Sequence, residues 1–111
     1  MEEISYDDFH KVDIRAGRVL RAEIFEKARK PAIKLWIDFG PLGEKKTSAQ
    51  ITKLYQPEDL PGRLVLAVVN FPPRQIADFM SEVLVLGVME DDETVVLLQP
   101  DHQVTPGQRV L

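Results

Sequence analysis

The stretch NFPPRQIADFMSEVLVLGVM, residues 70–89, decides the fold, because it joins two apolar runs through a stiff loop. Pro72 and Pro73 fix their own φ angles and push the residue before each of them toward extended geometry. The apolar runs 64–69 and 83–89 lack the gaps of a helical pattern, so we expect two buried strands there. The loop between them is either a recognition loop held by the scaffold or only a stiffened connection.

The composition is that of one small globular domain. The chain has 111 residues, of which 44% are hydrophobic and 29% are charged, so we expect a single domain over residues 1–111. It contains no cysteine, which excludes disulfides and a cysteine nucleophile. The acidic N-terminus lacks the apolar core of a signal peptide, and no apolar run approaches the roughly 20 residues of a membrane span. We therefore expect a cytoplasmic protein without membrane insertion.

Charge is distributed unevenly along the chain, although the net charge is only −4. Residues 11–53 contain eleven Lys and Arg residues against five Asp and Glu residues, whereas residues 1–10 and 54–111 are both acidic. Such asymmetry either creates one basic face that attracts a phosphate backbone or is spread over unrelated surfaces.

Alternation of apolar and polar residues predicts the strands that precede the loop. Residues 11–25 are expected to form one long, half-buried strand, and Gly17 in its middle is expected to mark a bulge or bend. Two further strands, 33–39 and 44–51, complete a three-stranded meander. One more strand is expected at 94–98, after an acidic turn.

Two short helical turns are expected as well. Ser5 can cap a turn that contains Tyr6 and Phe9, whose rings would cover one end of the core. A second short helix is expected within 52–60, with Pro57 at a helical start. A long first strand that bends at a glycine, followed by a helix between the third and fourth strands, favours an all-β, five-stranded OB-fold barrel.

Several apolar side chains are expected on outward faces. The strands 64–69 and 83–89 are apolar on both faces, so they need cover, which the C-terminal segment supplies within one chain or across a dimer. Of these two we favour a homodimer. Trp36 is expected on the outer face of its strand, beside Lys34. There it could stack on a base, dock an apolar peptide, lie in a subunit interface or be covered by its own chain.

Motifs for catalysis and for cofactors are absent from the sequence. The two histidines, His10 and His102, lack metal-ligand spacing, and there is no phosphate-binding glycine loop or nucleophile elbow. The acidic run 90–93 lacks the spacing of a calcium loop. We therefore expect a protein that is not an enzyme and that uses neither a cofactor nor a metal.

A family resemblance rests on five segments, namely VDIRAGRVLRAE, ARKPAIKLWIDFG, KKTSAQIT, VVNFPPRQIADFMSEVLVLG and PDHQVTPGQRV. Together they resemble the tRNA-binding-domain family, and in particular its CsaA-type export-related chaperones. The resemblance implies an OB-fold with extra C-terminal strands, about residues 90–111, that build a homodimer. It also implies binding of tRNA by structure and not by sequence, while the CsaA branch is described as binding unfolded peptides and pre-proteins.

Candidate ligand contacts follow from the charge pattern and from this resemblance. In the family motif an asparagine ends the fourth strand and a serine opens the fifth, and these positions match Asn70 and Ser81. The expected RNA-binding residues are Arg15, Lys30, Lys34, Lys46, Asn70, Arg74 and Ser81, with Trp36 or Phe79 stacking on bases. The expected peptide-binding residues are Trp36, Phe71, Phe79 and Met80.

Two residues depart from the family pattern near the expected RNA surface. Asp78 falls where the pattern usually has glycine, and Glu82 stands where many tRNA binders have glutamine. Both carboxylates would repel a nearby phosphate and weigh against tight binding of tRNA. Two functions therefore stay open. One is a CsaA-like chaperone in protein export that binds unfolded segments, tRNA or both, with the export machinery as a further partner. The other is a structure-specific tRNA-binding protein with no chaperone role.

Overall fold

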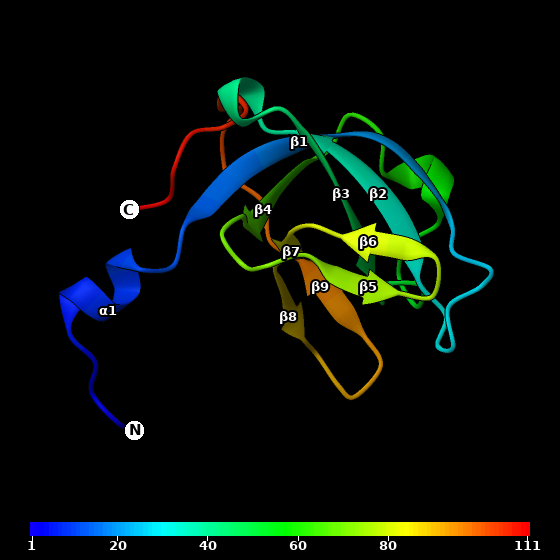
Figure 1. The fold of residues 1–111 in the computed structure, drawn as a ribbon, viewed down its shortest axis with the longest axis horizontal. Helices are drawn as coiled ribbons and strands as arrows, with labels where there is room; N and C mark the ends of the chain where they lie inside the picture. Colours follow the sequence, from blue (N-terminus) through cyan, green and yellow to red (C-terminus); the bar gives the residue numbers. More distant parts are fainter.

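The long first strand is the centre of the sheet in the computed structural model, which describes all 111 residues (Figure 1). β1 (Ile14–Ile24) pairs antiparallel with β2 (Ile33–Asp38) and with β4 (Leu64–Val68). β3 (Glu44–Ala49) extends the sheet beyond β2, and β7 (Leu84–Val85) extends it beyond β4. The resulting order β3-β2-β1-β4-β7 confirms the predicted all-β, OB-type barrel.

The barrel closes between β3 and the segment that leads into β7, and side chains make much of this seam. The Ser81 hydroxyl oxygen accepts a hydrogen bond from the backbone N–H of Ser48 at 3.2 Å and lies 2.9 Å from Oγ1 of Thr47. The Thr47 hydroxyl in turn donates to the carbonyl of Val83 at 2.6 Å. Polar residues of β3 therefore complete the closure of the barrel.

The barrel encloses one apolar core. The alternation predicted for β2 is confirmed, because Ile33, Leu35 and Ile37 are fully buried while the residues between them face outward. Between β3 and β4 the chain forms a 3-10 turn, Pro57–Asp59, where a short helix was predicted, and Leu60 directly after it is buried. A second 3-10 turn, Gly40–Leu42, joins β2 to β3.

The bend in β1 differs from its prediction. The register shift lies between Val19 and Arg21, so the bulge is at Leu20, which is exposed, and not at Gly17. Gly17 has another role, because a Cβ atom there would lie only 2.6 Å from a ring carbon of Phe39. The glycine is thus needed for close packing of the strand on the core, and the bulge reverses the alternation of the remaining residues.

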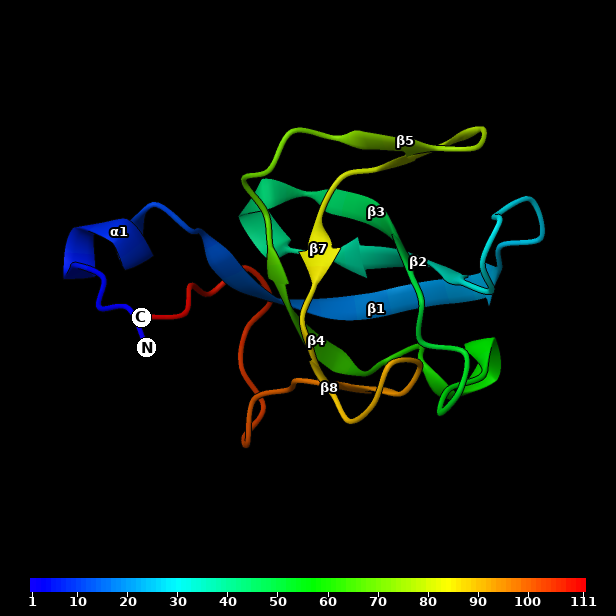
Figure 2. The same ribbon diagram turned by 90° about the horizontal axis from the view of Figure 1, so that it is seen from below.

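The loop 70–81 is more regular than predicted. It contains a small hairpin of β5 (Arg74–Ile76) and β6 (Phe79–Ser81), with Ala77 at the turn in the left-handed region at φ 51°. Figure 2 shows this hairpin beside β3, at the edge of the barrel. The stiff loop is therefore an arm that extends the outer surface of the sheet.

The strand predicted over 83–89 is divided into two. β7 stays in the barrel, whereas β8 (Gly87–Met89) leaves it and pairs with β9 (Val95–Leu97) in a separate hairpin. Gly87 permits this pairing, because a Cβ atom there would lie 3.0 Å from the carbonyl oxygen of Val96. All three residues of β8 are exposed, so the chain itself leaves this apolar segment uncovered.

The two chain termini lie on the same side of the barrel (Figures 1 and 2). α1 (Tyr6–His10) begins after Ser5, which forms a capping box with Asp8. This helix stands away from the barrel and Tyr6 is 65% exposed, so the prediction that it covers the core is wrong. The C-terminal segment runs along the start of β1, where the N–H of Val110 donates to the carbonyl of Ile14. None of the helices has the length and apolar character that a membrane span requires.

Candidate nucleic-acid interface

The outer face of β1, β2 and β3 carries two rows of cross-strand neighbours. In the first row Arg21 lies opposite Trp36, and Trp36 lies opposite Lys46. In the second row Lys34 lies opposite Glu23, and the two side chains approach to 4.0 Å. Adjacent strands are about 4.8 Å apart, so each row brings its side chains within reach of a single ligand.

An aromatic cluster borders this face at the hairpin. The ring of Phe79 packs edge-on against Phe25, with centroids 5.4 Å apart, and against Trp36 at 6.0 Å. Phe25, Ala32 and Phe79 are buried together as a small second core. Only 6% of Phe79 is exposed, so the expectation that its ring contacts a base or a peptide directly is corrected. The ring instead anchors the hairpin by packing on Phe25 and Trp36.

Three cations lie over these rings. The guanidinium carbon of Arg21 is 3.9 Å from the ring centre of Trp36. The ammonium groups of Lys34 and Lys46 lie 5.0 and 5.2 Å from the ring centre of Phe79. Neither Arg21 nor Lys46 forms an ion pair within the chain. The face therefore presents positive charge that the protein, which is acidic overall, leaves largely unneutralised.

A salt bridge connects the two segments that flank this face. Nζ of Lys27, in the loop after β1, lies 2.8 Å from the carboxylate of Asp78 in the hairpin turn. The hydrogen bond from Lys27 lowers the pKa of Asp78 and raises the pKa of Lys27 itself. The charge of Asp78 is thus locally balanced. Lys30 in the same loop and Arg74 at the start of β5 are both exposed.

Glu82 and Ser81 belong to the seam of the barrel. The Glu82 carboxylate accepts a hydrogen bond from the backbone N–H of Lys46 at 3.0 Å, and the Glu82 N–H donates to the Lys46 carbonyl at 2.8 Å. This residue therefore takes the place of a strand partner for β3. The Ser81 hydroxyl is likewise engaged by Thr47 and Ser48 of β3.

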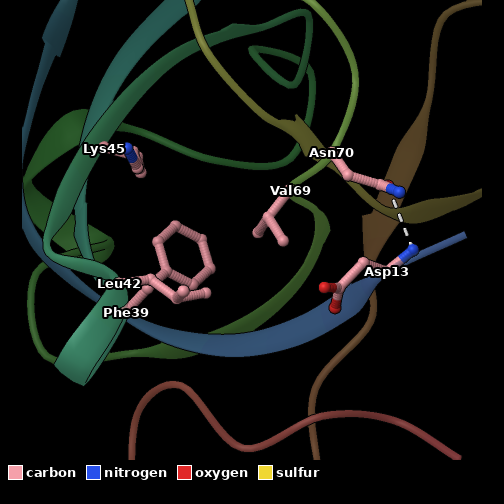
Figure 3. Close-up of a pocket in the computed structure, with 6 residues that line it drawn as sticks. All are labelled: Asp13, Phe39, Leu42, Lys45, Val69 and Asn70. Carbon is pink, nitrogen blue, oxygen red and sulfur yellow. Dashed lines mark hydrogen bonds between the residues drawn. The ribbon is translucent and has the colours of Figure 1, made fainter.

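Arg15 and Asn70 are not brought to this face. The amide of Asn70 accepts a hydrogen bond from the N–H of Asp13 at 3.0 Å, as Figure 3 shows, and donates to the carbonyl of Lys11 at 2.7 Å. Arg15 Nε lies 2.6 Å from the Asp13 carboxylate, and this hydrogen bond lowers the pKa of Asp13. These contacts anchor the segment between α1 and β1.

A shallow pocket of about 220 Å³ lies at the same end of the barrel (Figure 3). Its lining residues are Asp13, Phe39, Leu42, Lys45, Val69 and Asn70. The side chains of Asp13 and Asn70 are already engaged within the chain, so the pocket offers few free polar groups to a ligand.

Sequence reasoning missed one residue of the cationic face, Arg21. Its position on the polar side of the first strand could be seen in the sequence, but its register against Trp36 depends on the bulge. Two of the predicted peptide contacts are accessible: Phe71 is 52% exposed and Met80 is 40% exposed.

Fold and face together define an OB-fold binding domain whose outer sheet surface is cationic. The family described as "Putative tRNA binding domain" matches residues 14–109 of this chain. The chain therefore belongs to the tRNA-binding-domain family.

Solved structures extend this likeness to whole chains. The crystal structure of the chaperone CsaA from Bacillus anthracis is 52% identical, with a TM-score of 0.95, over 99% of this chain and 100% of that one. The CsaA chaperone protein from Picrophilus torridus is 48% identical, with a TM-score of 0.91, over 98% of this chain and 100% of that one. The predicted resemblance to CsaA-type proteins is thus confirmed.

Curated relatives include much longer proteins. The methionine–tRNA ligase of Archaeoglobus fulgidus is 43% identical over 109 residues, which are 98% of this chain but 16% of the ligase. Methionine–tRNA ligase 1 of Sorangium cellulosum is 43% identical over 108 residues, 97% of this chain and 15% of the ligase. The chain thus spans about one sixth of the length of these relatives.

Proposed function

We propose that the protein binds tRNA through the outer face of β1, β2 and β3, and that it recognises the RNA by shape and backbone charge. The observation that carries this proposal is the set of cations at Arg21, Lys34 and Lys46, two of which have no acidic partner. Membership in the tRNA-binding-domain family supports the same ligand. Contacts of these cations with phosphates carry no sequence information, so recognition of this kind is independent of sequence.

Titration of bulk tRNA at several salt concentrations tests this function. Three phosphate contacts would release condensed counterions, so the plot of log affinity against log salt should have a slope of about −2 to −3. A single-stranded RNA of equal length serves as the comparison for dependence on tRNA structure. Absence of binding at 50 mM salt, or an affinity that does not change with salt, would refute the proposal.

A second function, the binding of unfolded peptides or pre-proteins during export, is favoured by the exposed apolar side chains of the hairpin arm. Phe71 and Met80 stand out there, and flexible or aromatic surfaces of this kind accept many partners. The likeness to two CsaA chaperones supports this function. It would place the protein in the cytoplasm, with the export machinery as a further partner.

Suppression of aggregation of a denatured test client would measure this activity. Phe71→Ser should weaken the suppression, and raised salt should change it little. Leu54→Ser is a matched control, because Leu54 is 53% exposed but lies in the turn after β3. Equal effects of the two substitutions would contradict a peptide site on the arm.

We further propose that the chain forms a homodimer through its C-terminal extension, about residues 90–111, together with β8. The apolar side chains that a second copy would cover are Leu84, Val88, Met89 and Val96, which are 39% to 62% exposed. Val88→Asp should then shift the mass measured by light scattering from two chains to one. A wild-type protein with the mass of one chain at micromolar concentration would rule this out.

A further inference from the structure

The guanidinium group of Arg21 lies over the indole of Trp36, although Arg21 has no acidic partner. Its guanidinium carbon lies 3.9 Å from the ring centre, and the side chain is exposed. An exposed arginine ordinarily loses much rotamer freedom when it binds a ligand, whereas stacking on an aromatic face restricts it beforehand. The pair therefore presents a guanidinium group whose orientation is set before any ligand arrives.

The bulge in β1 creates this pair. Leu20 is the extra residue, and after it the register continues with Arg21 opposite Trp36. If the strand continued in the register of Val19 and Ile37 with no bulge, Leu20 would lie opposite Trp36, and Arg21 would lie opposite Leu35, whose side chain is fully buried in the core. β-Bulges are known for re-aiming side chains next to functional sites. Here the bulge turns a basic side chain from the core side of the sheet to its outer face.

We propose that Arg21, positioned by Trp36, is the anchor for a phosphate of the bound RNA backbone. This inference rests on the proposed tRNA binding. It goes beyond that function because it assigns the phosphate contact to Arg21 and gives Trp36 a supporting role. Trp36 carries Arg21 on its ring and meets Phe79 edge-on, so it holds the guanidinium in place and is not itself a platform for a base.

The surroundings of Arg21 favour a phosphodiester chain as the ligand. A guanidinium group offers planar, paired N–H donors that match two phosphate oxygens. Lys46 lies in the same cross-strand row and Lys34 in the next row, so positive charge continues across the sheet beyond the reach of a single small anion. An apolar peptide would have to desolvate these charges without compensation.

The inference is tested by titrating bulk tRNA into the wild type and into Arg21→Gln, Arg21→Lys and Arg63→Gln. Arg63 is the matched control, because its guanidinium also lies over an aromatic ring, 5.3 Å from the centre of Tyr55, but the residue directly precedes β4. Arg21→Gln should weaken binding about tenfold at low salt and reduce the salt slope by about one. Arg63→Gln removes the same charge and should leave both quantities near the wild-type values.

Trp36 provides an independent readout, because it is the only tryptophan in the chain. Its fluorescence should change when tRNA binds the wild type, and Arg21→Gln should alter the emission of the free protein. Arg21→Lys keeps the charge, so the dependence of tRNA affinity on salt should stay close to that of the wild type. The variant loses the guanidinium that lies over Trp36, so the change in Trp36 fluorescence on tRNA binding should be lost.

The outcomes separate this inference from the proposed function. If the wild type binds tRNA but Arg21→Gln and Arg63→Gln behave alike, the anchor is wrong and tRNA binding stands. If the wild type does not bind tRNA, both fail. If Trp36 responds to an unfolded peptide, independently of salt, and not to tRNA, the face belongs to a peptide and the inference is overturned. Urea midpoints of all variants separate loss of binding from loss of folding.

Discussion

Thr47→Val removes a buried hydroxyl from the seam of the barrel while it keeps the shape of the side chain. Thr47 is 1% exposed and is the only polar residue among the buried ones. Its hydroxyl donates to the Val83 carbonyl at 2.6 Å and lies 2.9 Å from the Ser81 hydroxyl. The substitution leaves a buried carbonyl without its donor, which costs about 1–3 kcal/mol. We therefore expect the free energy of unfolding to fall by about 2 kcal/mol.

Urea unfolding followed by circular dichroism measures this loss. The urea concentration at the midpoint should fall, while the slope of the unfolding free energy against urea concentration should not change. The melting temperature should drop by several degrees for each kcal/mol of lost unfolding free energy. Thr47→Ser keeps the hydroxyl and should be closer to the wild type. In a double-mutant cycle with Ser81→Ala, the two losses should not add, because the two side chains share one network. A Thr47→Val protein within about 0.5 kcal/mol of the wild type would refute the role of side chains in closing the barrel.

Three further predictions concern packing, pH and charge. Gly17→Ala should lower the free energy of unfolding by about 1–3 kcal/mol in urea, because the added methyl group would overlap the ring of Phe39; unchanged stability would contradict this. The hydrogen bond from Arg15 lowers the pKa of Asp13 in the folded protein. Ionised Asp13 therefore stabilises the fold fully above the pKa of about 3.9 that it has in the unfolded chain, and this stabilisation is lost as the pH falls through the lower pKa of the folded state. The difference in unfolding free energy between the wild type and Asp13→Asn should thus be constant above about pH 4 and shrink below it. Glu82→Gln keeps an acceptor oxygen but removes a negative charge, so tRNA affinity at low salt should rise roughly threefold, and a titration that finds no rise would contradict the placement of this charge.

The barrel strands could be predicted where alternation is uninterrupted. β2 is such a case: its inward residues are buried, and Trp36 is on the outer face as predicted. The bulge at Leu20 could not be predicted, because a leucine at an exposed bulge looks like a core residue in an alternating pattern. Gly17 misled the prediction, since a glycine required by close packing and one required by a bulge have the same sequence signal.

The candidate contacts show a related limit of sequence reasoning. Asn70 and Ser81 are polar residues at the ends of strands, where a ligand contact and a backbone cap look alike in the sequence. In the structure both side chains are engaged with the backbone of other segments. Whether they also touch RNA stays a prediction. The hairpin 74–81 was missed because its strands have three residues each, which is too short for a periodic signal.

The two acidic departures from the family pattern have different consequences in three dimensions. Asp78 is held 2.8 Å from Lys27, so its charge is balanced within the pair that joins the two flanking segments. Glu82 has a backbone N–H as its partner and no cation, so its charge remains at the border of the proposed RNA-binding face. Of the two carboxylates, only that of Glu82 would therefore repel a bound polyanion without a balancing cation. It lies beside Lys46, which is one of the cations without an ion-pair partner. A face that combines free cations with one retained carboxylate should bind tRNA with modest affinity and with an affinity that falls as salt is raised. A peptide bound at the neighbouring apolar arm should then be able to compete with tRNA for this part of the surface.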